Sequence, residues 1–235
     1  MSKNNAQIKA LAAAFPHTIP ILAGFLFLGM TYGILITTEG FPFWFPILTS
    51  IFVFAGSAEF AGVSMLLGGF NPLQALAMTL MINARHLFYG ISMLEKYKGI
   101  GAKKLYLIFG LCDESFSINC TADIPEDVDR GDFMFFVTLL DQLYWISGCT
   151  LGGIFGSFIS FNTEGLDFVM TAMFVVIFLE QWLKEKSHIS SIAGLAIPFL
   201  CLVIFGADKF IIPSMIALVF ALALLRRPIE RGVNE

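Results

Sequence analysis

Eight long apolar stretches constrain this chain more than any other feature. They run roughly over residues 15–38, 43–68, 71–94, 104–120, 132–160, 165–183, 189–206 and 209–225. A helix needs about 20 apolar residues to cross about 30 Å of hydrocarbon. Of the 235 residues, 57% are hydrophobic and 14% are charged, whereas a soluble domain has about 25% charged residues. This composition excludes a disordered chain, a coiled coil and a nucleic-acid binder, and a soluble domain of this size would have too little interior.

The sequence therefore predicts an all-α polytopic membrane protein with about eight hydrophobic helical segments in a single transmembrane domain, residues 1–235. Backbone that faces lipid must satisfy its own hydrogen bonds, and the alternating segments of a β-barrel are absent. The polar N-terminus, residues 1–14, is expected to be retained because no cleavage site follows it. Four cysteines lack the spacing of a zinc or redox site and are expected to be buried apolar residues: Cys112, Cys120, Cys149 and Cys201.

Two stretches carry polar interruptions. Stretch 43–68 contains the sequence FAGSAEF over residues 54–60, and stretch 104–120 contains Asp113, Glu114 and Ser115. Such interruptions predict broken or re-entrant helices, which a membrane tolerates only where the unwound backbone lines a cavity or packs inside protein.

The positions of lysine and arginine bear on the topology. Eight crossings would place the N-terminus, loop 184–188 and the C-terminal arginines in the cytoplasm but the lysine-bearing loop 95–104 outside. Six crossings, with 43–68 and 104–120 re-entrant, would place every basic loop inside, and this interpretation is slightly favoured. Both interpretations put the C-terminus in the cytoplasm. The basic residues of that tail are Arg226, Arg227 and Arg231.

Glycines recur four residues apart in the first and fifth stretches. The two series are Gly29 and Gly33, and Gly148, Gly152 and Gly156. This spacing lets two helix backbones approach closely. The shared pattern also allows an internal duplication, with halves near 15–120 and 132–225.

Seven ionisable residues fall inside the apolar stretches. A charge at the bilayer centre costs at least about 2.5–3.5 kcal/mol, so each is a functional candidate. A buried carboxylate without a partner tends to hold a proton and can couple transport to a proton gradient. Glu180 lies four residues before Lys184 and is expected to pair with it at the interface, whereas Asp141 and Gln142 lie deeper, where a helix–helix hydrogen bond is an equal alternative. The seven are Glu59, Arg85, His86, Asp113, Glu114, Asp141 and Glu180.

The densest polar cluster is Asn83, Arg85 and His86, followed by Tyr89. On a continuous helix Arg85 and Tyr89 would share one face, and Asn83 and His86 another. Arg85 could bind a carboxylate through two parallel N–H bonds. That carboxylate could belong to a substrate amino acid or to the protein's own Glu59 or Asp113, and the internal salt bridge is the simpler interpretation. His86 could relay protons or hold structure.

Gly56 and Ser57 allow the second stretch to unwind. Freed amides at the start of a half-helix attract anions such as carboxylates, although small residues also serve tight helix packing. The chain has no ATP-binding or hydrolase motif, so it is expected to be no enzyme and to carry no cofactor or metal.

Three segments together resemble the AzlC family: TSIFVFAGSAEF at 49–60, NARHLFYG at 83–90 and CDESF at 112–116. That family supplies the large subunit of branched-chain amino acid exporters. The resemblance implies export driven by the proton gradient and a small AzlD-type membrane partner, without an ATPase subunit. Glu59 stands where the family more often has glutamine, and Ala84 and Cys112 also depart from its usual leucine and threonine.

The sequence thus predicts a multi-pass transporter of the cell membrane that exports branched-chain or similar small apolar amino acids. The alternatives are a passive channel and an accessory scaffold subunit without its own transport site. The main candidates for substrate binding or coupling are Gly56, Ser57, Glu59, Asn83, Arg85, His86, Asp113 and Glu114, and the secondary ones are Tyr89, Asp141 and Gln142.

Overall fold

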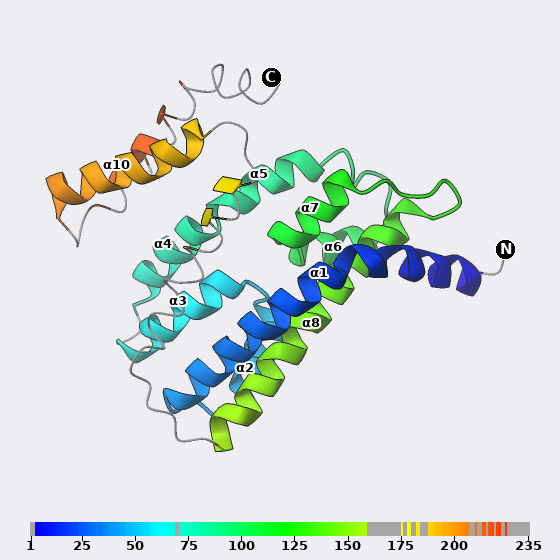
Figure 1. Ribbon diagram of the computed structural model, residues 1–235, viewed down its shortest axis with the longest axis horizontal. Coiled ribbons are helices and arrows are strands. Elements are labelled where there is room, and N and C mark those ends of the chain that lie inside the picture. The colour runs from blue at the N-terminus through cyan, green and yellow to red at the C-terminus, as the bar shows by residue number, and fades with distance from the viewer. Residues whose placement is uncertain are drawn as a thin grey trace. The chain divides into compact units, whose positions relative to one another are not determined.

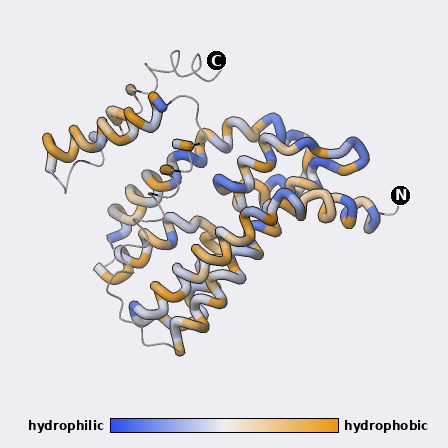
Figure 2. Tube along the Cα trace, in the orientation of Figure 1, coloured by the Kyte–Doolittle hydropathy of each residue, from blue (hydrophilic) through white to orange (hydrophobic). Residues whose placement is uncertain are grey.

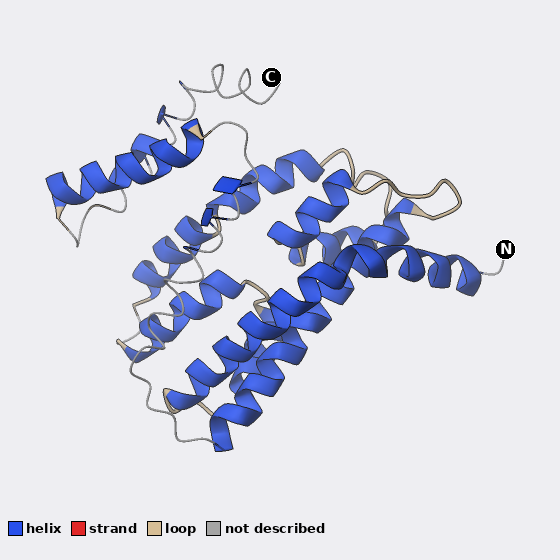
Figure 3. Ribbon diagram, in the orientation of Figure 1, coloured by secondary structure: helices blue, strands red, loops and turns tan. Residues whose placement is uncertain are grey.

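The computed structural model describes residues 3–68, 71–158 and 188–206. It also describes the short runs 175, 178–179, 182–183, 210, 213–214, 216–218, 220–221 and 224. Every regular element among these residues is an α-helix, as Figure 3 shows, which agrees with the predicted all-α class. The chain divides into two compact units, Met1–Glu164 and Gly165–Glu235.

The first unit is built on two long helices, α1 (Lys3–Thr38) and α8 (Arg130–Phe158). Both are long and apolar enough to cross a membrane, and Figure 2 shows apolar residues along both. No other helix in the described part of the chain meets that test, so the eight predicted segments are not confirmed. The apolar stretch 15–38 lies within α1, and the polar N-terminal residues continue the helix back to Lys3.

The two long helices run parallel and touch through their glycines. Near one end, the hydroxyl oxygens of Thr18 and Tyr144 lie 3.1 Å apart. A Cβ atom added at Gly29 would lie 3.0 Å from the backbone nitrogen of Cys149, and one at Gly148 would lie 2.8 Å from two carbonyl oxygens of α1. Similar backbone contacts surround Gly33, Gly152 and Gly156. The predicted close approach of two helix backbones is confirmed, and the two glycine series face each other.

The second stretch folds into a hairpin of two short helices, α2 (Phe45–Phe52) and α3 (Gly56–Leu67). The helix breaks where the polar interruption predicts, and Phe54 has φ of +46° there. The tip of the hairpin lies beside α8, because Gln142 Nε2 donates to the carbonyl oxygen of Ile51 over 3.1 Å. Figure 1 shows α2 starting beside the C-terminal end of α1 and α3 turning back from the tip.

The third stretch was predicted as one helix over 71–94, and this was wrong. It is divided into α4 (Pro72–Ile82) and α5 (Ala84–Met93) at Asn83. The amide of His86 donates to the carbonyl of Asn83 over 2.9 Å, a three-residue spacing that tightens the chain at this point. Asparagine favours such local turns because its side chain competes with helical hydrogen bonds.

The fourth stretch forms a second hairpin from α6 (Lys103–Phe109) and α7 (Asp113–Thr121). Lys103 forms an ion pair with Asp132 in the first turn of α8. Lys96 Nζ donates to the carbonyl oxygen of Cys120 over 2.6 Å at the end of α7. Both open ends therefore lie near the start of α8, while the tip at Gly110 packs against Thr138. This is the shape expected of a re-entrant segment.

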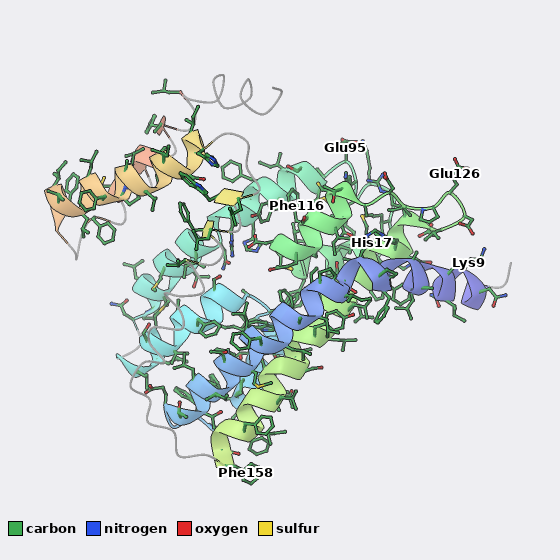
Figure 4. The ribbon with its side chains drawn as sticks, in the orientation of Figure 1. Lys9, His17, Glu95, Phe116, Glu126 and Phe158 are labelled. Atoms are coloured by element: carbon green, nitrogen blue, oxygen red, sulfur yellow. The ribbon has the colours of Figure 1, made fainter. Side chains whose placement is uncertain are left out.

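The end of the unit that contains Lys9 also contains the lysine-bearing loop. Met93 and Leu107 pack with Ala14 of α1 and Phe133 of α8 in one buried cluster. Figure 4 shows Lys9, Glu95 and Glu126 toward this end and Phe158 at the other. For the first five stretches, this is the arrangement that the six-crossing interpretation requires.

The second unit contains α10 (Ile189–Phe205), which matches the predicted stretch 189–206. Most of stretches 165–183 and 209–225, with Glu180 and the C-terminal arginines, lies outside the described residues, so the total number of crossings and the duplication stay predictions. All four cysteines are free; Cys149 and Cys201 are buried as predicted, whereas Cys112 and Cys120 are half-buried.

Candidate functional site

Three helices begin at the same place in the first unit. They are α3, α5 and α7, and each starts just after a break in its apolar stretch. Helix N-termini carry unpaired amides and a partial positive charge. No side chain caps the start of α3 or α5. The breaks in sequence therefore create a local environment that favours negative charge.

Arg85 joins the three helix starts. Its Nη1 forms an ion pair with Asp113 Oδ2 over 2.5 Å, and its Nη2 donates to Ser57 Oγ over 3.4 Å. Each side chain of the ion pair is about one third exposed, at 34% for Arg85 and 31% for Asp113. Of the carboxylates considered from the sequence, Asp113 is thus the one that pairs with Arg85. Arg85 Nε and Asp113 Oδ1 are buried and have no hydrogen-bond partner among the described residues.

Glu59 is held by α8 instead of by Arg85. Trp145 Nε1 donates to Glu59 Oε2 over 2.8 Å, and the carboxylate is buried. Its other oxygen, Oε1, has no hydrogen-bond partner in the described part of the chain. Gly56, three residues earlier, allows this packing because a Cβ there would lie 3.0 Å from the Trp145 ring. The small residue thus serves tight packing, one of its two predicted roles.

Asp141 and Gln142 are neighbours in sequence but differ in their bonds. The Tyr106 hydroxyl donates to Gln142 Oε1 over 2.5 Å, and Gln142 also holds the end of α2. The predicted helix–helix hydrogen bond is therefore present at Gln142. Asp141 is fully buried, and neither of its carboxylate oxygens has a partner among the described residues.

The remaining candidates line the start of α5 and α7. Asn83 immediately precedes α5, and His86 Nδ1 lies 3.3 Å from the Asn83 carbonyl oxygen. His86 packs edge-on against Tyr89, which stacks on Phe116 of α7 with ring centroids 4.4 Å apart. Glu114 lies in the first turn of α7, next to Asp113. All four candidates are half-buried.

Two residues that shape the candidate site were not identified from the sequence. Ser115 is fully buried and closes the α6–α7 break, since its hydroxyl contacts both the Cys112 amide (3.0 Å) and the Gly110 carbonyl (3.1 Å). Trp145 was also missed. The helical spacing from Asp141 was a usable signal for it, because residues four apart share a helix face.

Comparison with known proteins gives consistent results. The family described as AzlC protein matches residues 20–159. The branched-chain amino acid transport protein AzlC of Bacillus subtilis is 60% identical over 99% of this chain and 91% of its own length. An uncharacterized membrane protein of Haemophilus influenzae is 48% identical over 99% of this chain and 96% of its own length. The inner membrane protein YgaZ of Escherichia coli is 25% identical over 72% of each chain. No solved structure matches the chain.

Proposed function

The chain belongs to the AzlC family, and we propose that it is a secondary transporter that exports branched-chain or similarly small apolar amino acids. Its relative in Bacillus subtilis is named a branched-chain amino acid transport protein. The observation that carries the proposal is Arg85, which stands at the meeting point of three helix starts and contacts both Asp113 and Ser57. A guanidinium among helix N-termini is suited to a substrate carboxylate.

The partial exposure of Arg85 distinguishes this site from a sealed structural ion pair. A fully buried ion pair would lose the hydration of both charges and would be closed to a ligand, whereas the guanidinium of Arg85 is partly exposed. Arg85 uses one strong bond to Asp113 and one long bond to Ser57. Exposed apolar side chains on the same two-part helix α4–α5, such as Leu80 and Leu87, are suited to lipid or to an aliphatic substrate.

Transport of radiolabelled leucine by reconstituted protein tests the proposal. Uptake into inside-out vesicles should saturate with leucine, and Arg85→Ala should lower it at least about tenfold because a charge-assisted bond to the substrate is lost. Lys98→Ala is the matched control, since that exposed lysine lies in loop 95–104, and it should transport normally. Normal transport by Arg85→Ala would refute a role for this arginine, and flux that never saturates would indicate a channel.

Proton coupling is the second part of the proposal, with Glu59 or Asp113 as the carrier. Glu59 is supported by its burial and by the unpaired Oε1, because a carboxylate in an apolar environment is stable without a charged partner only when it holds a proton. An imposed proton gradient should accelerate leucine transport by the wild type. The Glu59→Gln variant should transport without responding to the gradient. An unchanged rate in the wild type would refute coupling to protons.

The proposed topology places the end with Lys9 and loop 95–104 in the cytoplasm, together with the C-terminus. It is supported by the common location of Lys9, Lys96 and Lys103 at one end of the first unit. A cysteine introduced at Lys98 should react with impermeant reagents only from the cytoplasmic side.

The proposal also includes a small AzlD-type subunit, and co-purification of such a subunit with the full chain tests it.

A further inference from the structure

The ion pair between Arg85 and Asp113 is incomplete. An arginine and a carboxylate can form two parallel bonds, but here only Nη1 and Oδ2 meet, over 2.5 Å. One donor of Arg85 (Nε) and one acceptor of Asp113 (Oδ1) are buried without a hydrogen-bond partner in the described residues. Unsatisfied buried groups are costly. The pair thus retains one unused positive donor and one unused negative acceptor side by side.

The surroundings favour opposite charges at two neighbouring points. Arg85 and the uncapped starts of α3 and α5 favour an anion. Asp113, with Glu114 beside it in the first turn of α7, favours a cation. The charges balance within the Arg85–Asp113 pair, and Glu114 adds a further acidic group beside it, so an additional anion would have no compensating charge in a place of limited solvent access.

We propose that Asp113 is a specificity-determining residue, and that the Arg85–Asp113 pair opens to bind the two ends of a zwitterion. The carboxylate of the substrate replaces Asp113 on Arg85, and its ammonium group binds the released Asp113. This inference rests on the proposed function and assigns the carboxylate of the substrate to Arg85 and its ammonium group to Asp113. No charge is gained or lost at the site when such a substrate enters.

The inference makes Asp113 the residue that excludes simple carboxylates. A carboxylate without an ammonium group would compete with Asp113 for one guanidinium and leave a second anion beside it. Removing the charge of Asp113 while keeping its shape should free Arg85 and admit that class of ligand. Removing the charge of Arg85 should have the opposite effect and admit amines.

Binding to the purified full chain tests the inference with three probes of the same hydrocarbon shape. They are L-leucine, 4-methylpentanoate, which lacks the ammonium group, and 3-methylbutylamine, which lacks the carboxylate. The wild type should bind leucine at least about tenfold more tightly than either analogue. Asp113→Asn should bind leucine about tenfold more weakly than the wild type does. Its affinity for 4-methylpentanoate should lie within about threefold of its affinity for leucine. Asp123→Asn, the same change at an exposed loop position, is the control and should keep the wild-type order.

The possible outcomes bear differently on the inference and on the proposed function. Absence of leucine binding by the wild type would contradict both. If Asp113→Asn binds the three ligands in the same order of affinity as the wild type, the inference is overturned and the proposed function stands. Equal affinity of the wild type for leucine and 4-methylpentanoate would have the same consequence. If Asp113→Asn does not fold, Arg85→Gln provides the mirror test. It should bind 3-methylbutylamine at least as well as leucine, and a preserved preference for leucine would overturn the inference.

Discussion

The side of α8 that faces α1 and the side that faces the two hairpins make different kinds of contact. Toward α1, glycines let the two backbones touch, and side-chain contacts such as Phe25 against Trp145 pack beside them. Toward the hairpins, Gln142 and Trp145 reach out with polar groups to Ile51, Tyr106 and Glu59. Backbone contact leaves no rotatable bond to rearrange, whereas side-chain hydrogen bonds can be exchanged for others. We infer that α1 and α8 form a fixed frame, and that the side-chain contacts of the hairpin tips are more easily exchanged.

The largest effect is expected from a change on the glycine side. Gly152→Val would place a side chain directly into the backbone of Met30, and such overpacking costs about 1–3 kcal/mol or more. We expect little folded protein, measured as monodisperse material after detergent extraction. Gly24→Val is the matched control because nothing lies within 4 Å of a Cβ there. Normal yield and thermal stability of Gly152→Val would show that the frame is not fixed.

A smaller structural effect but a large functional one is expected on the hairpin side. Asp141→Leu replaces a buried carboxylate that lacks hydrogen-bond partners among the described residues with an apolar side chain of similar size, so thermal stability should be unchanged or higher. Leucine transport should fall at least about tenfold if the carboxylate serves the transport cycle.

The control for this change is Ser147→Ala, an exposed polar position on the same helix whose hydroxyl donates to the carbonyl oxygen of Leu143 one turn earlier. It should keep both stability and transport. A strong loss of stability in Asp141→Leu would instead identify Asp141 as a structural residue, and both sides of α8 would then serve mainly to hold the fold together.

The smallest effect is expected far from both sides, at the exposed ion pair of Lys9 and Asp127. The hydrogen bond and charge of Lys9 lower the pKa of Asp127. A lowered pKa stabilises the fold above the ordinary aspartate value of about 4, and this contribution disappears as the pH falls through the lowered pKa. Since exposed pairs contribute little, Lys9→Gln should change the melting temperature at pH 7 by less than about 2 °C and leave transport unchanged. A larger change in melting temperature would show that the ion pair at this end of α1 also contributes to the fixed frame.

Much of the fold followed from local sequence signals. The polar interruptions predict the breaks near Phe54 and Asp113, because backbone in lipid unwinds only where polar or small residues can support it. The glycine spacing predicts close backbone contact. The break at Asn83 was missed because the surrounding residues have a continuous apolar pattern, and a single asparagine is compatible with either a helix or a turn.

The candidate site was predicted as a set of residues but not as a set of contacts. The free-energy cost of placing a charged side chain in the bilayer identifies Glu59, Arg85 and Asp113 as functional candidates. It does not say which of the two carboxylates pairs with the arginine. That choice depends on where two hairpins end in space, and no local pattern contains this information. Trp145 had a usable signal in its helical spacing from Asp141, but its partner Glu59 lies in another segment. Ser115 was missed although its partners, Gly110 and Cys112, are close in sequence.

The two hairpins have a consequence for access to the site. The α2–α3 hairpin starts beside the end of α1, and the α6–α7 hairpin starts beside the beginning of α8, so they enter the first unit from opposite ends. Their tips meet where Phe54 approaches Gly110. Under the proposed function, a solute bound at Arg85 would be separated from one end of the unit by the α2–α3 hairpin and from the other end by the α6–α7 hairpin. Displacement of one hairpin would then open the site to water from one end of the unit, while the other hairpin still closed it from the opposite end.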